Sequence, residues 1–483
     1  MKPLAHTAFS WVLRWLVGTV LTLFTLLPAF AHDTGHHADL TREALAADGF
    51  GETAIRVVQV QNWLTDYYSN SPTAPSSLKA GLEELHCDNL FTTQAIQNYH
   101  GRFLVNARDA VRQATADHNA LALLTLLGVS LHTMQDFYSH SNWVETHPPG
   151  PDGAFRTDTI FTNPPRPGDP PLFTGAYPNL RPGATMLHGD YVSGLNKDSY
   201  VRPRWAEGYV FAYAVSRQWV NAVRTWSQEV DRNFWRTIQT FGDPGGLAGD
   251  FDAAFRISEW VALNGANGHW KGFGSGSLAE FLAFELRWTT SPDSAMVREF
   301  KSNLTPLLLS QHLTGDTPPT TTPPTVAGLP LNVRAVLLRT LRVREAPVGL
   351  FELKIDPGGK ADFFAEIQIA GQTFIEATQI DRSDVRPFWT TIKFVPTTTR
   401  SVAVRYRLWD EDGALRGDDD LCDIRTGRGS DLNFNMNLAT RMCSGDVAGI
   451  RDREARAFQA TGTGGANRAI VNFFITTRNV RNP

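Results

Sequence analysis

Side chains of types that bind metal ions recur at intervals of four in residues 131–145, LHTMQDFYSHSNWVE. They are His132, Asp136 and His140, and on a helix this spacing places them along one face. Imidazole nitrogens and carboxylate oxygens are common ligands of Zn²⁺ in proteins. A buried aspartate between two histidines is costly unless a cation neutralises it or the three groups form a hydrogen-bonded triad. We therefore expect a metal-binding helix here, with a hydrogen-bonded core triad as the alternative.

The other histidines lie in the same N-terminal part of the chain. All 13 histidines precede residue 313 and none follows it. His32 would become the first residue after removal of a signal peptide, and its α-amino group and imidazole would then form a chelate. His36, His37, Asp66, His86, Asp88 and His188 could converge on one cluster with the metal-binding helix. Their spacing along the sequence leaves that convergence open.

Residues 1–31 have the features of a signal peptide. Lys2 and Arg14 give a weakly basic start, residues 15–30 are almost wholly apolar, and Ala29 and Ala31 form a small-x-small cleavage site. The apolar stretch is short for a membrane span, and an uncleaved anchor is the alternative. We expect cleavage after Ala31 and a mature protein that is secreted or periplasmic.

The elements that must position these residues are helices. The chain of 483 residues exceeds one ordinary hydrophobic core, and a Thr/Pro-rich linker at residues 313–330 divides it. Before the linker, apolar residues recur at three- and four-residue spacing, which predicts a helical domain over residues 32–312. Its helices are expected at residues 40–47, 53–68, 92–116, 120–137, 205–238, 251–263 and 277–288. Residues 148–182 are rich in proline and glycine, which predicts a long surface loop that could cover a site.

After the linker, short stretches of alternating polarity are separated by turn residues, which predicts β-strands. The strands are expected at residues 333–341, 363–369, 391–394, 402–409, 432–438 and 469–476. Together they predict an antiparallel β-sandwich over residues 331–483, so the expected fold class is multidomain α plus β. Cys422 and Cys443 lie close together here, and export would permit a disulfide between them, whereas Cys87 is expected to be a buried thiol.

Acidic residues of the predicted sandwich gather in two loops. One loop supplies Asp356 and Asp362, and the other supplies Asp410, Asp412 and Asp418. Clustered carboxylates repel one another unless a cation joins them, and all-oxygen ligation suits Ca²⁺. A solvated acidic turn is the alternative. The arrangement resembles the calcium-dependent lipid-binding sandwiches of synaptotagmin and protein kinase C, which implies docking on an anionic phospholipid membrane. A glycan-binding or purely structural sandwich remains open.

Six segments of the N-terminal part resemble the heterokaryon-incompatibility protein C (HET-C) family of fungi and its bacterial relatives, in the same order. They are HHADLTREAL (36–45), QNWLTDYYS (61–69), EELHCDN (83–89), LGVSLHTMQDFYSHSNWVE (127–145), HGD (188–190) and GLNKDS (194–199). The long match at 127–145 is specific, and the short ones gain weight from their order. The resemblance covers most of residues 32–225.

HET-C proteins in turn are similar to zinc-dependent phospholipases C and to single-strand-specific nucleases, which are all-helical and hold three zinc ions. The resemblance implies Zn²⁺ as cofactor. The implied ligands are His32, His37, Asp66, His86, His132, Asp136, His140 and His188. One departure concerns a histidine that commonly follows the GINKD element of the family. Trp205 stands there in this chain, and Glu207 nearby could substitute.

The chemistry implied is hydrolysis of a phosphodiester. Zn²⁺ lowers the pKa of the water it binds, and adjacent divalent ions hold phosphate oxygens. Asp66, His132 and Asp136 are the expected catalytic residues, with Asp66 orienting the water or accepting its proton. The segment GSGSL at 274–278 fits a serine-nucleophile elbow poorly, because no strand precedes it.

The expected function is that of an exported, phospholipase C-like hydrolase of membrane phospholipids. A net charge of −4 gives no basic field to gather nucleic acid, so no dedicated nucleic-acid binding is expected. No protein partner is evident. The alternatives are a nuclease with the same metal residues, and a membrane-binding toxin or incompatibility factor without turnover.

Overall fold

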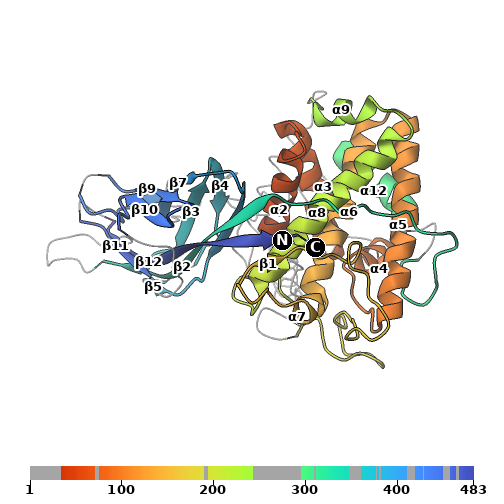
Figure 1. Ribbon diagram of the computed structural model, residues 1–483, viewed down its shortest axis with the longest axis horizontal. Helices are drawn as coiled ribbons and strands as arrows, with labels where there is room; N and C mark the ends of the chain where they lie inside the picture. The colour runs from red at the N-terminus through yellow and green to blue at the C-terminus, as the bar shows by residue number, and fades with distance from the viewer. Residues whose placement is uncertain are drawn as a thin grey trace, which may run out of the picture.

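The computed structural model describes residues 34–70, 76–189, 194–242, 295–308, 312–346, 360–376, 378–379, 382–410, 419–427, 429–449, 457–463 and 467–482. Figure 1 shows a group of helices beside a domain of β-strands. The predicted signal peptide, His32, the helices expected at 251–263 and 277–288, and the segment 274–278 lie outside the described residues. So do Asp356, Asp412 and Asp418 of the two acidic loops.

The helical part confirms the periodicity of the sequence. Its helices are α2 (Thr34–Ala46), α3 (Glu52–Asn70), α4 (Ser76–Leu85), α5 (Thr93–Ala116), α6 (Ala120–His140), α7 (Trp143–Thr146), α8 (Trp205–Gln228), α9 (Phe234–Gln239) and α12 (Ala295–Leu308). The single helix expected at 205–238 is wrong, because the chain turns between α8 and α9. In that turn the Asp231 carboxylate accepts a hydrogen bond from the backbone N–H of Asn233 at 2.8 Å.

Helix α6 is the centre of the helical part and packs against α3, α5, α8 and α12. Its first turn is capped by Asn119, whose side chain accepts a hydrogen bond from the N–H of Ala122. Among the described helices, α6 alone is long and apolar enough to cross a membrane, but its apolar window is 89% buried inside the protein. It is therefore the core helix, and its polar side chains are held in a dry interior.

The approach of α6 to α3 depends on Gly128. A Cβ at Gly128 would lie 2.6 Å from the carbonyl oxygen of Val58 and 2.6 Å from the Cβ of Gln61. A real Cβ does not come so close to a backbone oxygen, so only glycine permits this helix contact. The two helices that carry Asp66 and the His132–Asp136 pair are thus in direct backbone contact.

Residues 148–182 do not form a detached lid. Strand β1 (Phe155–Arg156) lies within them and pairs in parallel with the last strand, β12 (Ala469–Arg481). Thr159, Ile160 and Leu172 of this loop are buried. The proline and glycine content correctly predicted irregular backbone, but apolar residues within the loop draw it onto the core.

The Thr/Pro-rich segment at 313–330 has no helix or strand, as expected, yet it lies against the helical part. The carbonyl oxygens of Thr314 and Gly315 accept hydrogen bonds from Arg102 and Asn98 of α5, at 3.4 and 3.0 Å. It follows α5 before it leads into β2 (Figure 1). The segment is therefore packed against the helical part and is not a free spacer between the two parts.

The C-terminal part contains two sheets, antiparallel except where β1 joins β12, which confirms the expected strand pattern. Its other strands are β2 (Val333–Glu345), β3 (Phe363–Ile369), β4 (Gln372–Ile375), β5 (Asp384–Val385), β6 (Thr390–Pro396), β7 (Ser401–Asp410), β8 (Asp420–Cys422), β9 (Leu432–Asn437), β10 (Met442–Gly445) and β11 (Phe458–Thr461). One sheet has the order β1-β12-β2-β5, with β6 on β2 and β11 on β12. The other has the order β10-β9-β7-β3-β4, with β8 on β7.

Side chains on β7 and β9 alternate between buried and more exposed positions, as strands with one face on a core do. Tyr406, Phe434 and Phe473 stack in that core. Cys422 and Cys443 are both buried and no disulfide joins them, so the pairing that export would permit is not formed. Cys87 is a buried free thiol, as expected.

The two parts share an interface built from α2, α8 and β6. Tyr213 of α8 stacks on Phe394 of β6 with ring centroids 3.8 Å apart. Glu43 of α2 is buried there and accepts hydrogen bonds from the Lys393 ammonium and from the backbone N–H of Phe394, both at 3.2 Å. Leu40 and Trp205 belong to the same apolar cluster as the sandwich core. This shared core joins the helical part to the sandwich.

Candidate metal centre

Helix α6 brings the three residues of its predicted stripe into the interior. His132, Asp136 and His140 are all fully buried. The Nε2 atom of His132 lies 3.0 Å from Oδ2 of Asp136, one helical turn away. Helix α3 adds Asp66, whose Oδ1 lies 3.6 Å from Nε2 of His132. The turn after α4 adds His86, whose Nδ1 lies 2.8 Å from Oδ2 of Asp136.

Helix α2 completes this group with His37. Its Nε2 atom lies 3.1 Å from Oδ1 of Asp136, on the oxygen that His86 and His132 leave free. Asp136 therefore bridges histidines from three different segments. We call His37, Asp66, His86, His132 and Asp136 the first cluster. It contains two triads, His37 with Asp66 and His132, and His86 with His132 and Asp136. Within each triad the possible ligand atoms lie within 4.8 Å of one another.

A second cluster lies beside the first and consists of Asp88, His140, His188 and Asp198. The Nδ1 atom of His188 lies 3.0 Å from Oδ2 of Asp88, and Nδ1 of His140 lies 3.7 Å from its Oδ1. Asp198 closes the other side, 3.3 Å from Nε2 of His140 and 3.8 Å from Nε2 of His188. The rings of His86 and His140 are 6.5 Å apart, which makes the two clusters neighbours.

Two of these ligand candidates were not among the predicted ligands. Asp88 stands in the motif segment 83–89, and Asp198 stands in the segment 194–199. Both therefore had a signal, because each carboxylate lies inside one of the short motifs on which the predicted resemblance rests. Only the fold shows that they face His140 and His188. His32 lies outside the described residues, so its predicted role stays a prediction.

Neutral amides orient the histidines of the first cluster. Oδ1 of Asn62 lies 3.1 Å from Nδ1 of His132, and Oε1 of Gln135 lies 2.6 Å from Nδ1 of His37. Because an amide oxygen only accepts, each Nδ1 donates a hydrogen bond to its amide, and each Nε2 faces the carboxylates, where a metal ion would bind. In the second cluster, Nδ1 of His140 donates to the backbone oxygen of His86 at 2.8 Å. Such outer contacts fix the tautomer that a metal requires.

The protonation of the clusters reflects burial opposed by neighbouring charge. Burial lowers the pKa of His132 to about 3, so this imidazole is neutral. Burial acts against the protonated form of His37 also, but the hydrogen bond and charge of Asp136 outweigh it and raise the pKa of His37. Burial alone would raise the pKa of Asp136, yet its contacts with His132, His140 and His37 hold it well below the ordinary value.

In the second cluster, Asp88 and Asp198 overcome the effect of burial and raise the pKa of His188 to about 10. Protons thus serve as the positive charge of this site, and a divalent cation has to displace them. The donor set suits that exchange, because imidazole with carboxylate is what Zn²⁺ binds. In addition, Nε2 of His86 is buried and makes no hydrogen bond within the described residues. The residues present therefore fit a group of metal ions.

Trp205 does not stand among the cluster residues. It is buried at the start of α8 and packs on His36, with ring centroids 4.7 Å apart. Glu207, which could have substituted for the usual histidine, is half-buried and belongs to none of the ligand groups found among the described residues. The second cluster is instead built from Asp88 and Asp198, so the departure at Trp205 leaves it with four ligand candidates.

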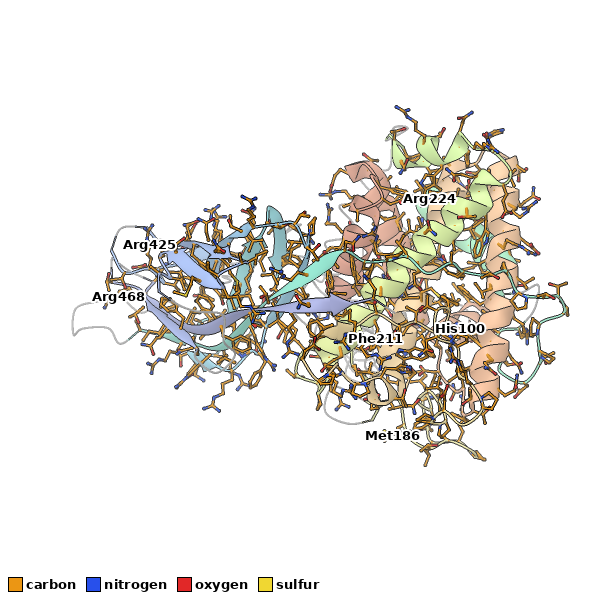
Figure 2. All side chains as sticks on the ribbon, viewed as in Figure 1. His100, Met186, Phe211, Arg224, Arg425 and Arg468 are labelled. Atoms are coloured by element: carbon orange, nitrogen blue, oxygen red, sulfur yellow. The ribbon has the colours of Figure 1, made fainter. Side chains whose placement is uncertain are left out.

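The sandwich brings two of its five predicted calcium ligands together. Oδ1 of Asp410 accepts a hydrogen bond from the backbone N–H of Asp362 at 2.5 Å, at the point where β7 ends and β3 begins. Strand β8 pairs with the end of β7, and Asp423 follows β8. Arg468 lies at this end too, because its backbone forms an isolated β-bridge with that of Asp423. We call it the distal end, because Arg468 lies at the far side of the sandwich from the helices (Figure 2). Asp356, Asp412 and Asp418 lie outside the described residues.

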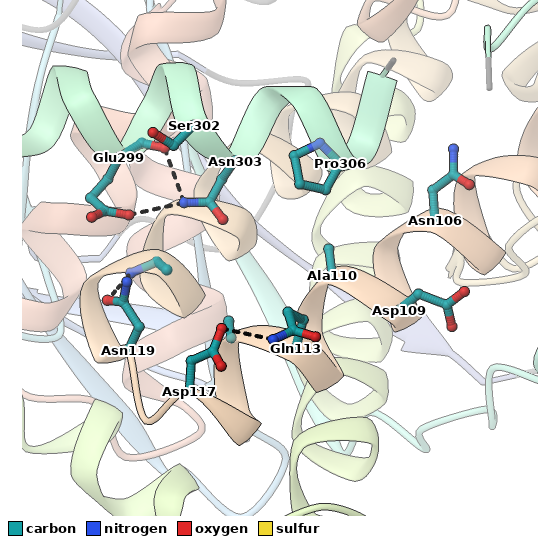
Figure 3. Close-up of a pocket in the computed structure, with 12 residues that line it drawn as sticks. Asn106, Asp109, Ala110, Gln113, Asp117, Asn119, Glu299, Ser302, Asn303 and Pro306 are labelled. Carbon is teal, nitrogen blue, oxygen red and sulfur yellow. Dashed lines mark hydrogen bonds between the residues drawn. The ribbon is translucent and has the colours of Figure 1, made fainter. Parts of the chain in front are cut away.

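A separate cleft of about 470 Å³ lies between α5 and α12 (Figure 3). It is lined by amides, carboxylates and small side chains, among them Asn106, Asp109, Gln113, Glu299 and Asn303. It contains no histidine and no member of either cluster. The cleft is therefore distinct from the candidate metal centre.

Comparison with protein families gives one match, to the VWA7 N-terminal domain, over residues 77–153. This segment contains His86, Asp88, His132, Asp136 and His140. No curated protein matches the sequence.

Among solved structures, the chain is similar to human GIVD cytosolic phospholipase A2 at 12% identity and a TM-score of 0.21, over 31% of this chain and 16% of that one. It is also similar to a C2 domain of plant extended synaptotagmin 1, at 13% identity and a TM-score of 0.21, over 30% of this chain and 94% of that one. A C2 domain protein from Ramazzottius varieornatus matches at 15% identity and a TM-score of 0.20, over 31% and 91%. The chain spans a small part of the phospholipase and nearly all of the two C2 proteins.

Proposed function

We propose that this protein is an exported, zinc-dependent phosphodiester hydrolase of the phospholipase C type, related to HET-C proteins, which acts on membrane phospholipids. The observation that carries the proposal is the pair of adjacent buried clusters, which together offer four carboxylates and five imidazoles. Four buried carboxylates make this set costly as part of a hydrophobic core, because buried negative charge has to be neutralised by a neighbouring cation or proton. It is suited to holding several divalent cations close together.

The residues have separable roles in this proposal. His37, His86, His132 and Asp136 hold ions in the first cluster, and Asp88, His140, His188 and Asp198 hold them in the second. Zn²⁺ supplies Lewis acidity, which lowers the pKa of water and offsets phosphate charge. Asp66 is fully buried beside His132 and His86, at 3.6 and 4.0 Å, where it can orient a water molecule or take its proton. Asn62 and Gln135 hold the imidazoles in the metal-binding tautomer.

Zinc content is the first test of this proposal. Protein purified without chelator should contain zinc by elemental analysis, and His132→Ala should lose most of it together with turnover. A suitable control is His118→Asn, because His118 is an exposed histidine outside both clusters. Zinc-free wild-type protein would rule out the proposed catalysis.

The substrate class is tested by the product. Release of diacylglycerol from phosphatidylcholine liposomes supports the phospholipase, whereas release of nucleotides from single-stranded DNA supports a nuclease. The net charge of −4 favours the lipid. Membrane permeabilisation that survives His132→Ala, without either product, would identify a toxin or incompatibility factor instead.

Export is part of the proposal. N-terminal sequencing of the mature protein should begin at His32, since cleavage after Ala31 is expected.

The calcium site is likewise proposed at the distal end, from Asp356, Asp362, Asp410, Asp412 and Asp418. Support for it comes from the contact between Asp362 and Asp410. Calorimetric titration with Ca²⁺ should show binding that Asp410→Asn abolishes.

A further inference from the structure

Exposed apolar side chains gather beside the second cluster. Leu180, Met186, Leu187 and Val201 have 62%, 41%, 40% and 44% of their surface exposed. The other large apolar side chains exposed to a similar extent in the described residues are Val230 and Met442, which stand alone on α8's C-terminal side and on β10. Single exposed apolar residues are ordinary, but a group of four within about twenty residues is not.

Hydrogen bonds join the segments that carry Met186, Leu187 and Val201, and Leu180 stands in the loop between Ala176 and Met186. The backbone N–H of Ala176 donates to Met186 at 3.0 Å, and the N–H of Leu195 donates to Leu187 at 3.1 Å. The N–H of Arg202 donates to Ser199 at 2.9 Å, which sets Val201 in the turn that follows the same segment. We call Leu180, Met186, Leu187 and Val201 the rim. Its residues stand on segments that hydrogen bonds connect to one another.

The rim adjoins the metal centre directly. Leu187 directly precedes His188 in the chain. The N–H of Asn196 donates to the backbone oxygen of His188 at 2.9 Å, and Asn196 lies two residues before Asp198. The His188 ring is buried against Asp88 while the side chain next to it is exposed. A molecule held on the rim would therefore be held at the edge of the second cluster.

The charge on the rim is positive. Arg181 is exposed between Leu180 and Met186, and Arg202 and Arg204 are partly exposed beyond Val201. The acidic side chain among the described residues from 180 to 204 is Asp198, which is fully buried. An apolar surface bordered by arginine complements an anionic lipid surface, where the apolar groups enter the acyl region and the cations meet headgroups.

We infer that the rim is the surface through which this protein docks on an anionic phospholipid bilayer, so that headgroups are presented to the second cluster. The inference rests on the proposed function for the identity of the substrate, but the docking itself does not require turnover. In this inference the helical part, and not the sandwich, makes the contact with the membrane that brings substrate to the metal centre. Met186 lies at the edge of the helical part, far from Arg468 at the distal end of the sandwich (Figure 2). The proposed calcium site and the rim therefore lie at different ends of the protein.

The test is binding of the full chain to vesicles in a flotation or sedimentation assay without added Ca²⁺. The vesicles are phosphatidylcholine mixed with phosphatidylserine, and phosphatidylcholine alone. The rim variant is Leu180→Glu with Met186→Glu, and the matched control is Val230→Glu with Met442→Glu, which adds the same charge at the two isolated exposed positions. The rim variant should bind the anionic vesicles at least about tenfold more weakly than wild type, and the control should bind as wild type.

Equal binding by wild type and the rim variant would overturn the inference, as would an equal loss in the control. Arg181→Glu is a second variant whose exposed position leaves folding unaffected, and it should weaken binding to anionic vesicles while leaving the weak binding to phosphatidylcholine alone unchanged. Hydrolysis of a soluble short-chain phosphodiester separates this inference from the proposed function. If no variant hydrolyses it but the rim variant still loses vesicle binding, the docking surface stands and the enzyme does not.

Discussion

A single amide decides how one imidazole of the first cluster is presented. Asn62 accepts from His132 through Oδ1, while its Nδ2 donates to Oε1 of Gln135 at 3.1 Å. The same Gln135 oxygen contacts His37. Asn62 therefore links the orientation of two histidines without being a ligand itself. Removing it should loosen both imidazoles and leave every ligand in place.

Asn62→Leu should lower zinc affinity by roughly 10- to 100-fold, because partners of this kind fix ring orientation and basicity. Competition with a chromogenic chelator measures it. Gln59→Leu is the control, since Gln59 is a buried amide on the same helix that contacts the backbone oxygen of Ala38 and no ligand. An unchanged affinity in Asn62→Leu would show that the ring of His132 is held by packing alone.

Asp198 makes a prediction about stoichiometry. Of the two clusters, its carboxylate contacts the second, through His140 and His188. Asp198→Asn should therefore remove the zinc of that cluster and leave the zinc of the first, and His188→Ala should reduce the zinc content to the same value. The double variant should lose no more than either single variant, as expected for two ligands of one site. Full zinc content in Asp198→Asn would contradict its assignment as a ligand.

At the scale of elements, the metal centre depends on how closely α6 approaches α3. Ala is the better helix former, so Gly128→Ala would be favourable in an isolated helix. Here its methyl group meets the carbonyl oxygen of Val58, and the helices must separate. We expect a loss of about 1–3 kcal/mol in the free energy of unfolding, together with weaker zinc binding, because Asp66 moves away from His132.

Gly208→Ala is the matched control for that substitution. A Cβ at Gly208 on α8 would meet its nearest neighbour, the carbonyl oxygen of Tyr138, at 3.6 Å, which is ordinary contact. This variant should gain about 0.5–1 kcal/mol from helix propensity and keep its zinc. Chemical denaturation with zinc analysis of both variants checks the pair. A stable, zinc-replete Gly128→Ala would show that the helices can repack.

The elements themselves could largely be predicted from the sequence. Helices α5 and α8 and strands β7 and β9 carry a clear apolar period, whereas α6 is buried on nearly all sides and appears in the sequence as a long apolar run. The end of α8 could not be predicted, since apolar residues such as Phe234 and Ile238 continue the helical period across the turn. The ligands on one helix were visible from their spacing. Asp88 and Asp198 were not, because their partner His140 lies 52 and 58 positions away and only the fold brings them together.

At the scale of the whole molecule, Glu43 places a carboxylate in the interface between the helical part and the sandwich. Burial raises its pKa from the ordinary 4.5 to about 7, although Lys393 and the N–H of Phe394 act in the other direction. Asp39 adds to the rise, and Tyr209 and Tyr213 at this contact are neutral phenols with raised pKa values. The carboxyl group of Glu43 thus changes charge near neutral pH.

The raised pKa of Glu43 makes the free energy of unfolding depend on pH. The folded protein holds a proton on Glu43 between pH 4.5 and about 7, where the unfolded chain has released it, so the free energy of unfolding falls as pH rises through this window. Glu43→Gln should remove this part of the slope, by at most about 3 kcal/mol. Denaturation at a series of pH values measures it. Glu366→Gln, at a partly exposed carboxylate paired with Arg407, should keep the wild-type slope, and parallel profiles for all three proteins would exclude Glu43.

The pairing of β1 with β12 has a consequence for how the protein is made. The loop after the metal-binding helix finds its neighbouring strand in residues 480–481, and Thr157 donates to the backbone oxygen of Arg481 across 324 positions of sequence. A ribosome completes that strand long after it has released the loop. Residues 155–157 therefore gain these contacts only after the last strand of the sandwich has been synthesised.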